Sequence, residues 1–127
     1  MSEVRDGLLY SEEHEWIKVE GDSGKVGITD HAQKEMNDIL YAEVPMVGKK
    51  VKKGETIGAI ESVKTVADVY SPVSGEIVEI NSELEDSPQF INESPYEKGW
   101  FVVIRLEDED ELEELMDAED YADFIGE

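Results

Sequence analysis

The stretch that decides the fold runs from residue 54 to residue 80 and reads GETIGAIESVKTVADVYSPVSGEIVEI. A Gly-Glu pair at 54–55 and another at 75–76 each open a short apolar run with strand character. The two runs flank residues 61–66, Glu-Ser-Val-Lys-Thr-Val, as two strands flank the tip of a hairpin. The pattern therefore predicts that Lys64 stands on a protruding turn.

Further short stretches of β character extend in both directions from this segment. Together with the central ones, they cover residues 16–19, 26–28, 39–44, 56–60, 69–70, 76–80 and 101–106. Gly, Pro, Ser and Asp residues that favour tight turns separate them. This spacing predicts a mainly β chain, folded as a barrel or sandwich.

Two helical patterns interrupt the strands. The first covers 30–36, where Asp30 can cap the helix and Gln33 can complete a capping box. The second begins near Asp110, with Glu113 placed to close a box, and its apolar residues at helical spacing predict C-terminal helices at 109–125 packed on the barrel. A loose acidic tail is the competing interpretation. The whole chain, 1–127, is expected to form one domain with a flexible N-terminus at 1–8.

The composition excludes several classes of function. Eleven Lys and Arg against 33 Asp and Glu leave a formal net charge of -22, which disfavours nucleic acid and anionic membranes as partners. There is no cysteine for a disulfide, a Cys-based zinc site or a Cys nucleophile, and no apolar run of membrane-spanning length. We expect a cytoplasmic protein. Its acidity is either a solubilising surface or an adaptation to a salty cytoplasm, as in a halophilic archaeon.

Several motifs resemble one known family. Residues 61–64 (Glu-Ser-Val-Lys) and 68–76 (DVYSPVSGE) are similar to the lipoylation region of glycine cleavage H proteins. The resemblance continues at 13–16 (EHEW) and 94–96 (SPY), and covers the chain from about residue 10 to residue 125. One departure is Met36-Asn37, where the family pattern usually has Leu-Gly, and this puts a local turn in doubt.

The resemblance implies a flattened β-barrel, the barrel-sandwich hybrid of the lipoyl-domain type, with lipoate in amide linkage to Lys64. It implies a carrier that has no catalytic residue of its own. The arm would take an aminomethyl group from a pyridoxal-phosphate glycine decarboxylase to a tetrahydrofolate-dependent aminomethyltransferase. Dihydrolipoyl dehydrogenase would then reoxidise it. A lipoate ligase or lipoyl transferase would load the lysine, and carriers of this kind act as monomers.

Other residues are expected to support Lys64. Glu61 is a candidate recognition charge for the ligase, although a solvated glutamate at a strand end is equally compatible with the sequence. Ser62, Val63 and Thr65 would form the tip. Tyr70 is the aromatic residue best placed to line a resting groove for the arm, and Gly75 would support presentation of the hairpin. His14 and His31 have no third ligand at a recognisable spacing, so no metal site is expected.

Four alternatives remain open at this point. A biotin carrier shares the hairpin lysine but typically places methionine on both sides of it, whereas Val63 and Thr65 stand here. A lipoyl relay would supply lipoate to other carriers. An acidic hydrolase would need two carboxyl groups with separated pKa values in one cleft, and no pair is singled out by spacing. A pure interaction module would not need Lys64 at all.

Overall fold

The computed structural model describes residues 2–127; Met1, the first residue of the predicted flexible N-terminus, lies outside the described residues. The strands are β1 (Leu9–Tyr10), β2 (Glu15–Glu20), β3 (Ser23–Ile28), β4 (Ile39–Glu43), β5 (Lys50–Val51), β6 (Thr56–Ser62), β7 (Val66–Tyr70), β8 (Gly75–Ile80) and β9 (Val102–Leu106). The helices are α1 (Asp30–Met36), α2 (Glu83–Asp86), α3 (Phe90–Glu93), the 3-10 helix η1 (Glu109–Glu114) and α4 (Ala118–Phe124). No helix between residues 2 and 127 is long and apolar enough to cross a membrane.

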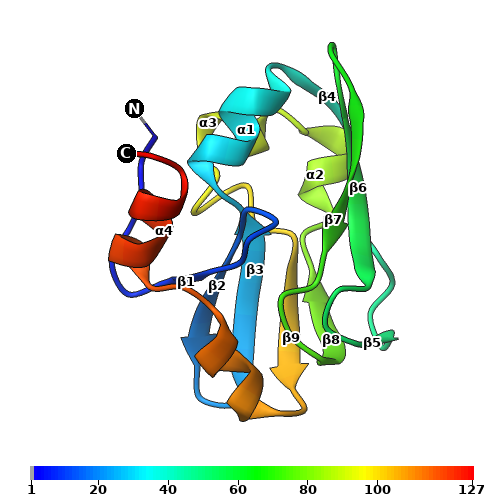
Figure 1. Ribbon diagram of the computed structural model, residues 1–127. Coiled ribbons are helices and arrows are strands. Elements are labelled where there is room, and N and C mark those ends of the chain that lie inside the picture. The colour runs from blue at the N-terminus through cyan, green and yellow to red at the C-terminus, as the bar shows by residue number, and fades with distance from the viewer. Residues whose placement is uncertain (1) are drawn as a thin grey trace.

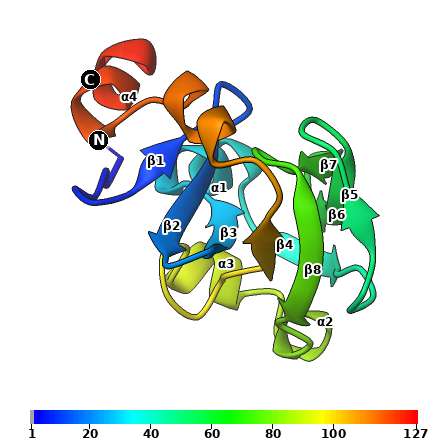
Figure 2. The same cartoon turned by 90° about the horizontal axis from the view of Figure 1, so that it is seen from below.

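The strands form two antiparallel sheets that face each other (Figures 1 and 2). One has the order β1-β2-β3-β9-β8-β5 and the other the order β4-β6-β7. Both contribute to one hydrophobic cluster, with Ile17 and Ile104 from the first sheet and Ile57 and Ile60 from the second. Burial of these apolar side chains is the main force that holds the sheets together. The predicted barrel-sandwich fold is confirmed.

The Lys64 hairpin has a different second strand from the predicted one. The sequence pattern paired the runs at 56–60 and 76–80, but β6 pairs with β7 and β8 pairs with β9 and β5 in the other sheet. The chain leaves β7 at Ser71-Pro72, where Ser71 Oγ donates to the carbonyl oxygen of Val73 at 2.5 Å. Proline has no N–H to continue a ladder, so the chain turns here and crosses to the second sheet.

Helix α1 spans the predicted residues, but its cap is Thr29 and not Asp30. Thr29 Oγ1 accepts a hydrogen bond from the backbone N–H of Ala32 at 3.2 Å. Asp30 is the first helical residue, and its carboxylate accepts from Gln33 Nε2 at 2.7 Å. The prediction was one residue too late because threonine and aspartate are both good caps and stand next to each other.

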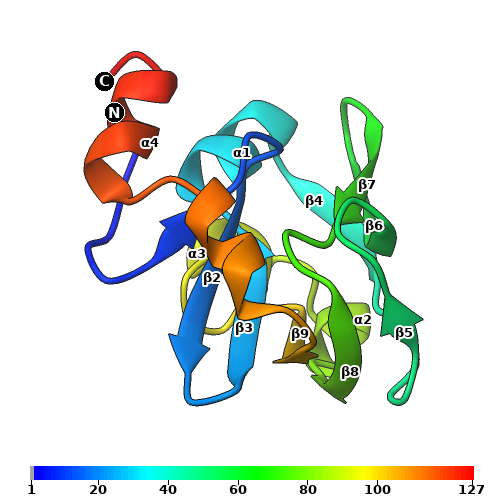
Figure 3. The same cartoon turned by 60° about the horizontal axis from the view of Figure 1, so that its bottom comes forward.

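The C-terminal region is two short helices separated by an extended segment. The first is η1, capped by Asp108 and not by Asp110 as predicted, and the second is α4, capped by Asp117. Between them, Met116 exchanges two backbone hydrogen bonds of 2.8 Å with Tyr10, which holds the chain extended. The Tyr121 ring then stacks on Tyr10 at 4.5 Å between centroids. Helix α4 therefore lies against β1, far from the β6–β7 hairpin in Figures 1 to 3.

The described part of the N-terminal segment is held by contacts with the rest of the chain. The N–H of Glu3 donates to Asp30 Oδ2 at 2.7 Å, and Tyr96 donates its hydroxyl hydrogen to the Glu3 carbonyl at 2.6 Å. The N–H of Ser2 donates to Glu127 at 2.6 Å, so the two ends of the chain lie side by side (Figure 1). These contacts join Ser2 and Glu3 to the rest of the chain, and the flexibility of the N-terminus stays a prediction. The sequence pattern also missed β1, β5, α2 and α3, all of four residues or fewer.

Candidate functional site

Lys64 lies in the turn between β6 and β7, which projects from the top of the molecule in Figure 1. Ser62, which is buried, organises this turn. Its Oγ accepts hydrogen bonds from the backbone N–H groups of Lys64 and Thr65, both at 3.1 Å, and donates to the Thr65 carbonyl at 3.3 Å. The Ser62 N–H also donates to the Thr65 carbonyl at 2.8 Å. The turn is therefore fixed, while the side chains of Val63, Lys64 and Thr65 remain exposed.

The Lys64 ammonium is weakly held. Its Nζ lies 3.5 Å from the carbonyl oxygen of Glu35, at the limit of a hydrogen bond. A groove of about 380 Å³ lies beside this ammonium group. The hairpin forms one wall, and α1 together with the turn before β2 forms the other. Its lining residues are Glu13, His14, Glu15, Ile28, His31, Ala32, Glu35, Met36, Ile60, Lys64, Thr65, Ala67, Asp68 and Val69. The lysine thus stands at the mouth of a partly apolar groove.

One groove residue, Glu15, is a buried acid that the sequence pattern did not single out. It is 3% exposed, and burial raises the pKa of its carboxyl to about 7, against partial compensation by hydrogen bonds from Ser11 Oγ and the Tyr70 N–H. The sequence did carry a signal for its burial, because Glu15 stands two residues before the buried Ile17 and so lies on the same, apolar side of strand β2. A carboxyl group at this position can hold or release a proton near neutral pH.

The two histidines meet at the end of the groove nearest α4. Their ring centroids are 4.8 Å apart, His31 Nε2 lies 2.8 Å from Glu35 Oε1, and His14 Nδ1 lies 2.8 Å from the Tyr121 hydroxyl. Burial, and secondarily the neighbouring His31, lowers the pKa of His14. Within the described residues 2–127, no group of three acidic or histidine side chains is placed to hold a metal ion. Both rings line the groove, and His14 links it to α4 through Tyr121.

The other predicted site residues, Glu61, Tyr70 and Gly75, lie in three different places. Glu61 is on β6 beside the tip and is exposed, as expected of a residue that a partner could contact. Tyr70 lies along a neighbouring hollow together with Tyr10 and Ser11, and not along the groove of Lys64. Glu15 lines both hollows.

Gly75 lies in β8, where an added Cβ would come within 2.1 Å of the Arg105 carbonyl oxygen. This close approach requires glycine for the pairing of β8 with β9. The structure therefore gives Gly75 a role in the pairing of the other sheet, and its part in presenting the hairpin stays a prediction.

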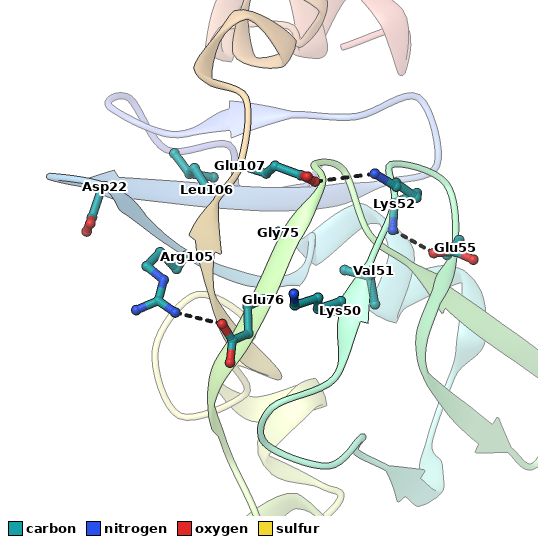
Figure 4. A pocket seen from close by; sticks show the side chains of 10 residues that line it. All are labelled: Asp22, Lys50, Val51, Lys52, Glu55, Gly75, Glu76, Arg105, Leu106 and Glu107. Atoms are coloured by element: carbon teal, nitrogen blue, oxygen red, sulfur yellow. Dashed lines mark hydrogen bonds and ion pairs between the residues drawn. The ribbon is translucent and has the colours of Figure 1, made fainter.

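The lysine-rich loop before β6 borders a third hollow of about 500 Å³ (Figure 4). Its charges are matched by acids: Lys52 Nζ lies 3.5 Å from Glu107, and Arg105 donates to Glu76 at 2.6 Å across the strands. Lys53 pairs with Glu114. These exposed pairs leave the loop solvated and its positive charge matched by neighbouring acids, so it presents no bare basic patch.

The departure from the family pattern at Met36-Asn37 coincides with an unusual backbone. Asn37 has φ 64° and ψ -154°, a region that glycine adopts without strain and other residues rarely enter. Its carbonyl accepts a hydrogen bond from Asn92 Nδ2 at 2.9 Å. Asparagine therefore keeps the turn that leads from α1 into β4.

Comparison with known proteins points to one family. The family model described as "Glycine cleavage H-protein" matches residues 8–127. A glycine cleavage system H protein from Staphylococcus saprophyticus is 57% identical over 124 residues, covering 98% of both chains. Another, from Halalkalibacterium halodurans, is 53% identical over 127 residues, covering 100% of this chain and 99% of the relative.

A solved structure agrees with these matches. The crystal structure of a glycine cleavage system H protein from Mycobacterium marinum superposes with a TM-score of 0.89 at 34% identity, covering 98% of this chain and 100% of that one. These relatives are bacterial, so they give no support to an archaeal source. The match over nearly the full length, in sequence and in fold, shows that the chain belongs to the glycine cleavage H-protein family.

Proposed function

We propose that the chain is the lipoyl carrier of a glycine cleavage system, with lipoate in amide linkage to Lys64. The observation that carries this is the position of Lys64, exposed on a fixed hairpin turn, with its Nζ making only a 3.5 Å contact. A structural lysine would normally be paired, whereas a carrier lysine has to be reached by an enzyme and then swing freely.

The groove beside Lys64 fits a tethered arm. Ile28, Met36, Ile60 and Val69 give it apolar walls, and an acylated lysine no longer carries the charge that opposes burial there. When bound, lipoate supplies a cyclic disulfide that can accept a carbon fragment and be reduced, chemistry that a chain without cysteine lacks. Glu15 and Asp68 in the groove wall would favour a cationic amine over an anionic group.

The partners follow from this role. Glycine decarboxylase, the tetrahydrofolate-dependent aminomethyltransferase and dihydrolipoyl dehydrogenase would each act in turn on the arm, and a ligase or transferase would attach it. The protein itself would be a cytoplasmic, monomeric, single-domain carrier without catalytic residues. A tether keeps the reactive group at high effective concentration for each partner, so each contact can be weak. The relatives' names favour glycine cleavage over a lipoyl relay or a biotin carrier.

The first experiment is the intact mass of the protein after incubation with a lipoate–protein ligase, ATP and lipoate, with peptide mapping around residue 64. Wild type should gain one lipoyl group on Lys64, and Lys64→Arg should gain none because a guanidinium is not acylated. Lys52→Arg, in the loop, is the matched control and should be modified as wild type is. The lipoylated wild type should support glycine oxidation with the three partner enzymes, and Lys64→Arg should abolish it.

Two results would contradict the proposal. One is an unmodified Lys64 in the presence of a ligase that modifies another carrier, and the other is a biotinyl adduct from cells supplied with both cofactors. Full lipoylation without glycine oxidation, combined with loss of lipoate from other carriers in cells that lack this protein, would favour the relay.

A further inference from the structure

A chain of side-chain hydrogen bonds joins the groove beside Lys64 to the C-terminal helix. The Tyr121 hydroxyl oxygen lies 2.8 Å from His14 Nδ1 and 2.8 Å from Thr29 Oγ1. Thr29 Oγ1 also accepts the backbone N–H of Ala32 at 3.2 Å. Thr29 and Tyr121 are both 0% exposed. The hydrogen-bond chain therefore runs through the interior, from the first turn of α1 to a histidine that lines the groove.

The hydrogen-bond chain has one direction that uses every hydrogen. Tyr121 has a single hydroxyl hydrogen, and burial raises its pKa to about 12, so it keeps this hydrogen and donates it to either His14 or Thr29. If it donated to Thr29, the hydroxyl hydrogen of Thr29 would need another acceptor, and Thr29 Oγ1 has no third partner within residues 2–127. A buried hydrogen without an acceptor is costly. Thr29 therefore donates to Tyr121, and Tyr121 donates to His14 Nδ1.

This direction determines the tautomer of His14. A ring nitrogen that accepts a hydrogen bond carries no hydrogen, so neutral His14 has its hydrogen on Nε2. Protonation of Nδ1 would oppose the hydrogen that Tyr121 donates there. Burial first, and the neighbouring His31 second, lower the pKa of His14, while Glu35 and Glu13 act in the opposite direction. His14 is therefore an uncharged N–H donor at neutral pH.

The backbone of His14 is held as firmly as its ring. Its φ is 68°, a left-handed conformation that is strained for a residue with a Cβ. Its N–H donates to the Ser11 carbonyl at 3.1 Å, and its carbonyl accepts from the Thr29 N–H at 3.0 Å. Strain that the surroundings enforce in this way is concentrated at functional sites. The position of His14 at the groove is therefore a candidate for a functional role.

We propose that Tyr121 is a positioning residue of the Lys64 groove, which acts through His14 to give the groove a fixed, neutral N–H donor for an anionic sulfur. The inference rests on the proposed carrier function and deepens it, because the reduced end of a dithiol arm can bear a thiolate. Hydrogen bonds to a charged partner are the strong ones, so an N–H donor stabilises the thiolate over the thiol.

The other groups around His14 do not replace this donor. They are Glu13 and Glu15 beside it, His31 and Glu35 on α1, Tyr121 on α4, and Lys64 and Asp68 on the hairpin and its second strand. The ionised carboxylates accept hydrogen bonds and repel a thiolate. His31 Nε2 is already 2.8 Å from Glu35 Oε1, and acylation removes the charge of Lys64. His14 Nε2, by contrast, has no partner within residues 2–127.

The first test is the tautomer of His14 in the unmodified protein. Long-range ¹H–¹⁵N NMR at about pH 8, where an unperturbed imidazole is neutral, shows which ring nitrogen carries the hydrogen. The chain has two histidines, so a His31→Gln protein assigns the signals. Wild type should show the Nε2–H form of His14.

Two variants break the hydrogen-bond chain at different points. Tyr121→Phe keeps the ring that stacks on Tyr10 but removes the donor, so His14 should become a mixture of tautomers. Thr29→Val leaves Tyr121 free to accept from His14, so the Nδ1–H form should gain population, although the Thr29 side chain does not contact the His14 ring. Thr29→Ser retains the hydroxyl and should restore the wild-type tautomer.

The second test is the pH profile of the arm's reduced sulfur. Because the chain has no cysteine, iodoacetamide alkylates only the arm of the lipoylated, reduced protein, and its rate follows the thiolate. The midpoint should be about half a pH unit higher in Tyr121→Phe than in wild type. Tyr96→Phe is the matched control, since it removes another buried hydroxyl, one that bonds to Glu3 and Asp30. Its midpoint should equal that of wild type.

Three results would overturn the inference. An Nδ1–H form of His14 in wild type would reverse the hydrogen-bond chain, and an unchanged tautomer in Thr29→Val would show that Thr29 does not direct it. Equal alkylation midpoints for wild type and Tyr121→Phe would remove the role of the donor while leaving the carrier function intact, because Lys64 would already bear the arm. Failure of wild-type Lys64 to be lipoylated would refute the carrier function, and with it the role of the donor, whereas the tautomer measurement would stand.

Discussion

Asn37 stores backbone strain at the junction of α1 and β4. Its φ of 64° with ψ of -154° costs a residue with a Cβ about 1–3 kcal/mol, and glycine avoids this cost. We therefore expect Asn37→Gly to raise the free energy of unfolding by about 1 kcal/mol, and the melting temperature by about 3–5 °C. Asn37→Ala should lower both, because alanine keeps the Cβ but lacks the tolerance of asparagine for positive φ. Equal melting temperatures for the three proteins would show that the turn relaxes without cost.

Glu15 should make stability depend on pH in an unusual direction. Its carboxyl has a pKa near 4.5 when unfolded and about 7 when folded, so between these values the folded state binds more protons. The contribution of this carboxyl to the free energy of unfolding is fully present below pH 4.5. It falls by up to about 3 kcal/mol as the pH rises to about 7. Glu15→Gln removes this titration, so relative to wild type it should gain stability between pH 5 and pH 8. Urea unfolding at several pH values measures the difference, and a constant difference would contradict the shifted pKa.

At the scale of the element, the β6–β7 turn depends on one hydroxyl group. Ser62→Ala removes the acceptor of the Lys64 and Thr65 N–H groups while both strands stay paired. We expect faster amide exchange at residues 64 and 65, a loss of about 1 kcal/mol in stability, and slower lipoylation because Nζ is less well positioned. Ser82→Ala is the control, since Ser82 makes no capping hydrogen bond with its side chain. Unchanged exchange at both amides would mean that the backbone bond alone holds the turn.

The elements also show how far sequence patterns reach. Strand character and turn residues located β6, β8 and the Lys64 turn, because alternation and Gly-Glu openings are local signals. Local signals do not specify which strand pairs with which, so the second strand of the hairpin was wrong. The break at Met116 was also missed, since it depends on hydrogen bonds to Tyr10, over 100 residues away. Within the site, Lys64 could be predicted from its motif. The groove that α1 and the turn before β2 form with the hairpin could be located only from the three-dimensional fold.

At the scale of the whole molecule, charge repulsion is a general destabilising force. The net charge is -22, and residues 107–127 hold twelve acids and no base. Folding concentrates these charges, so screening them should favour the folded state. We expect the melting temperature to rise as NaCl increases from about 10 mM to 1 M, where the screening length falls from about 30 Å to about 3 Å. Most of the rise should come at the lower concentrations, because screening saturates, whereas a general salt effect on hydrophobic burial would keep growing with concentration. A melting temperature that does not change with salt would mean that the acids lie far enough apart in the fold for their repulsion not to affect stability. It would also remove any reason to associate this composition with a salty cytoplasm.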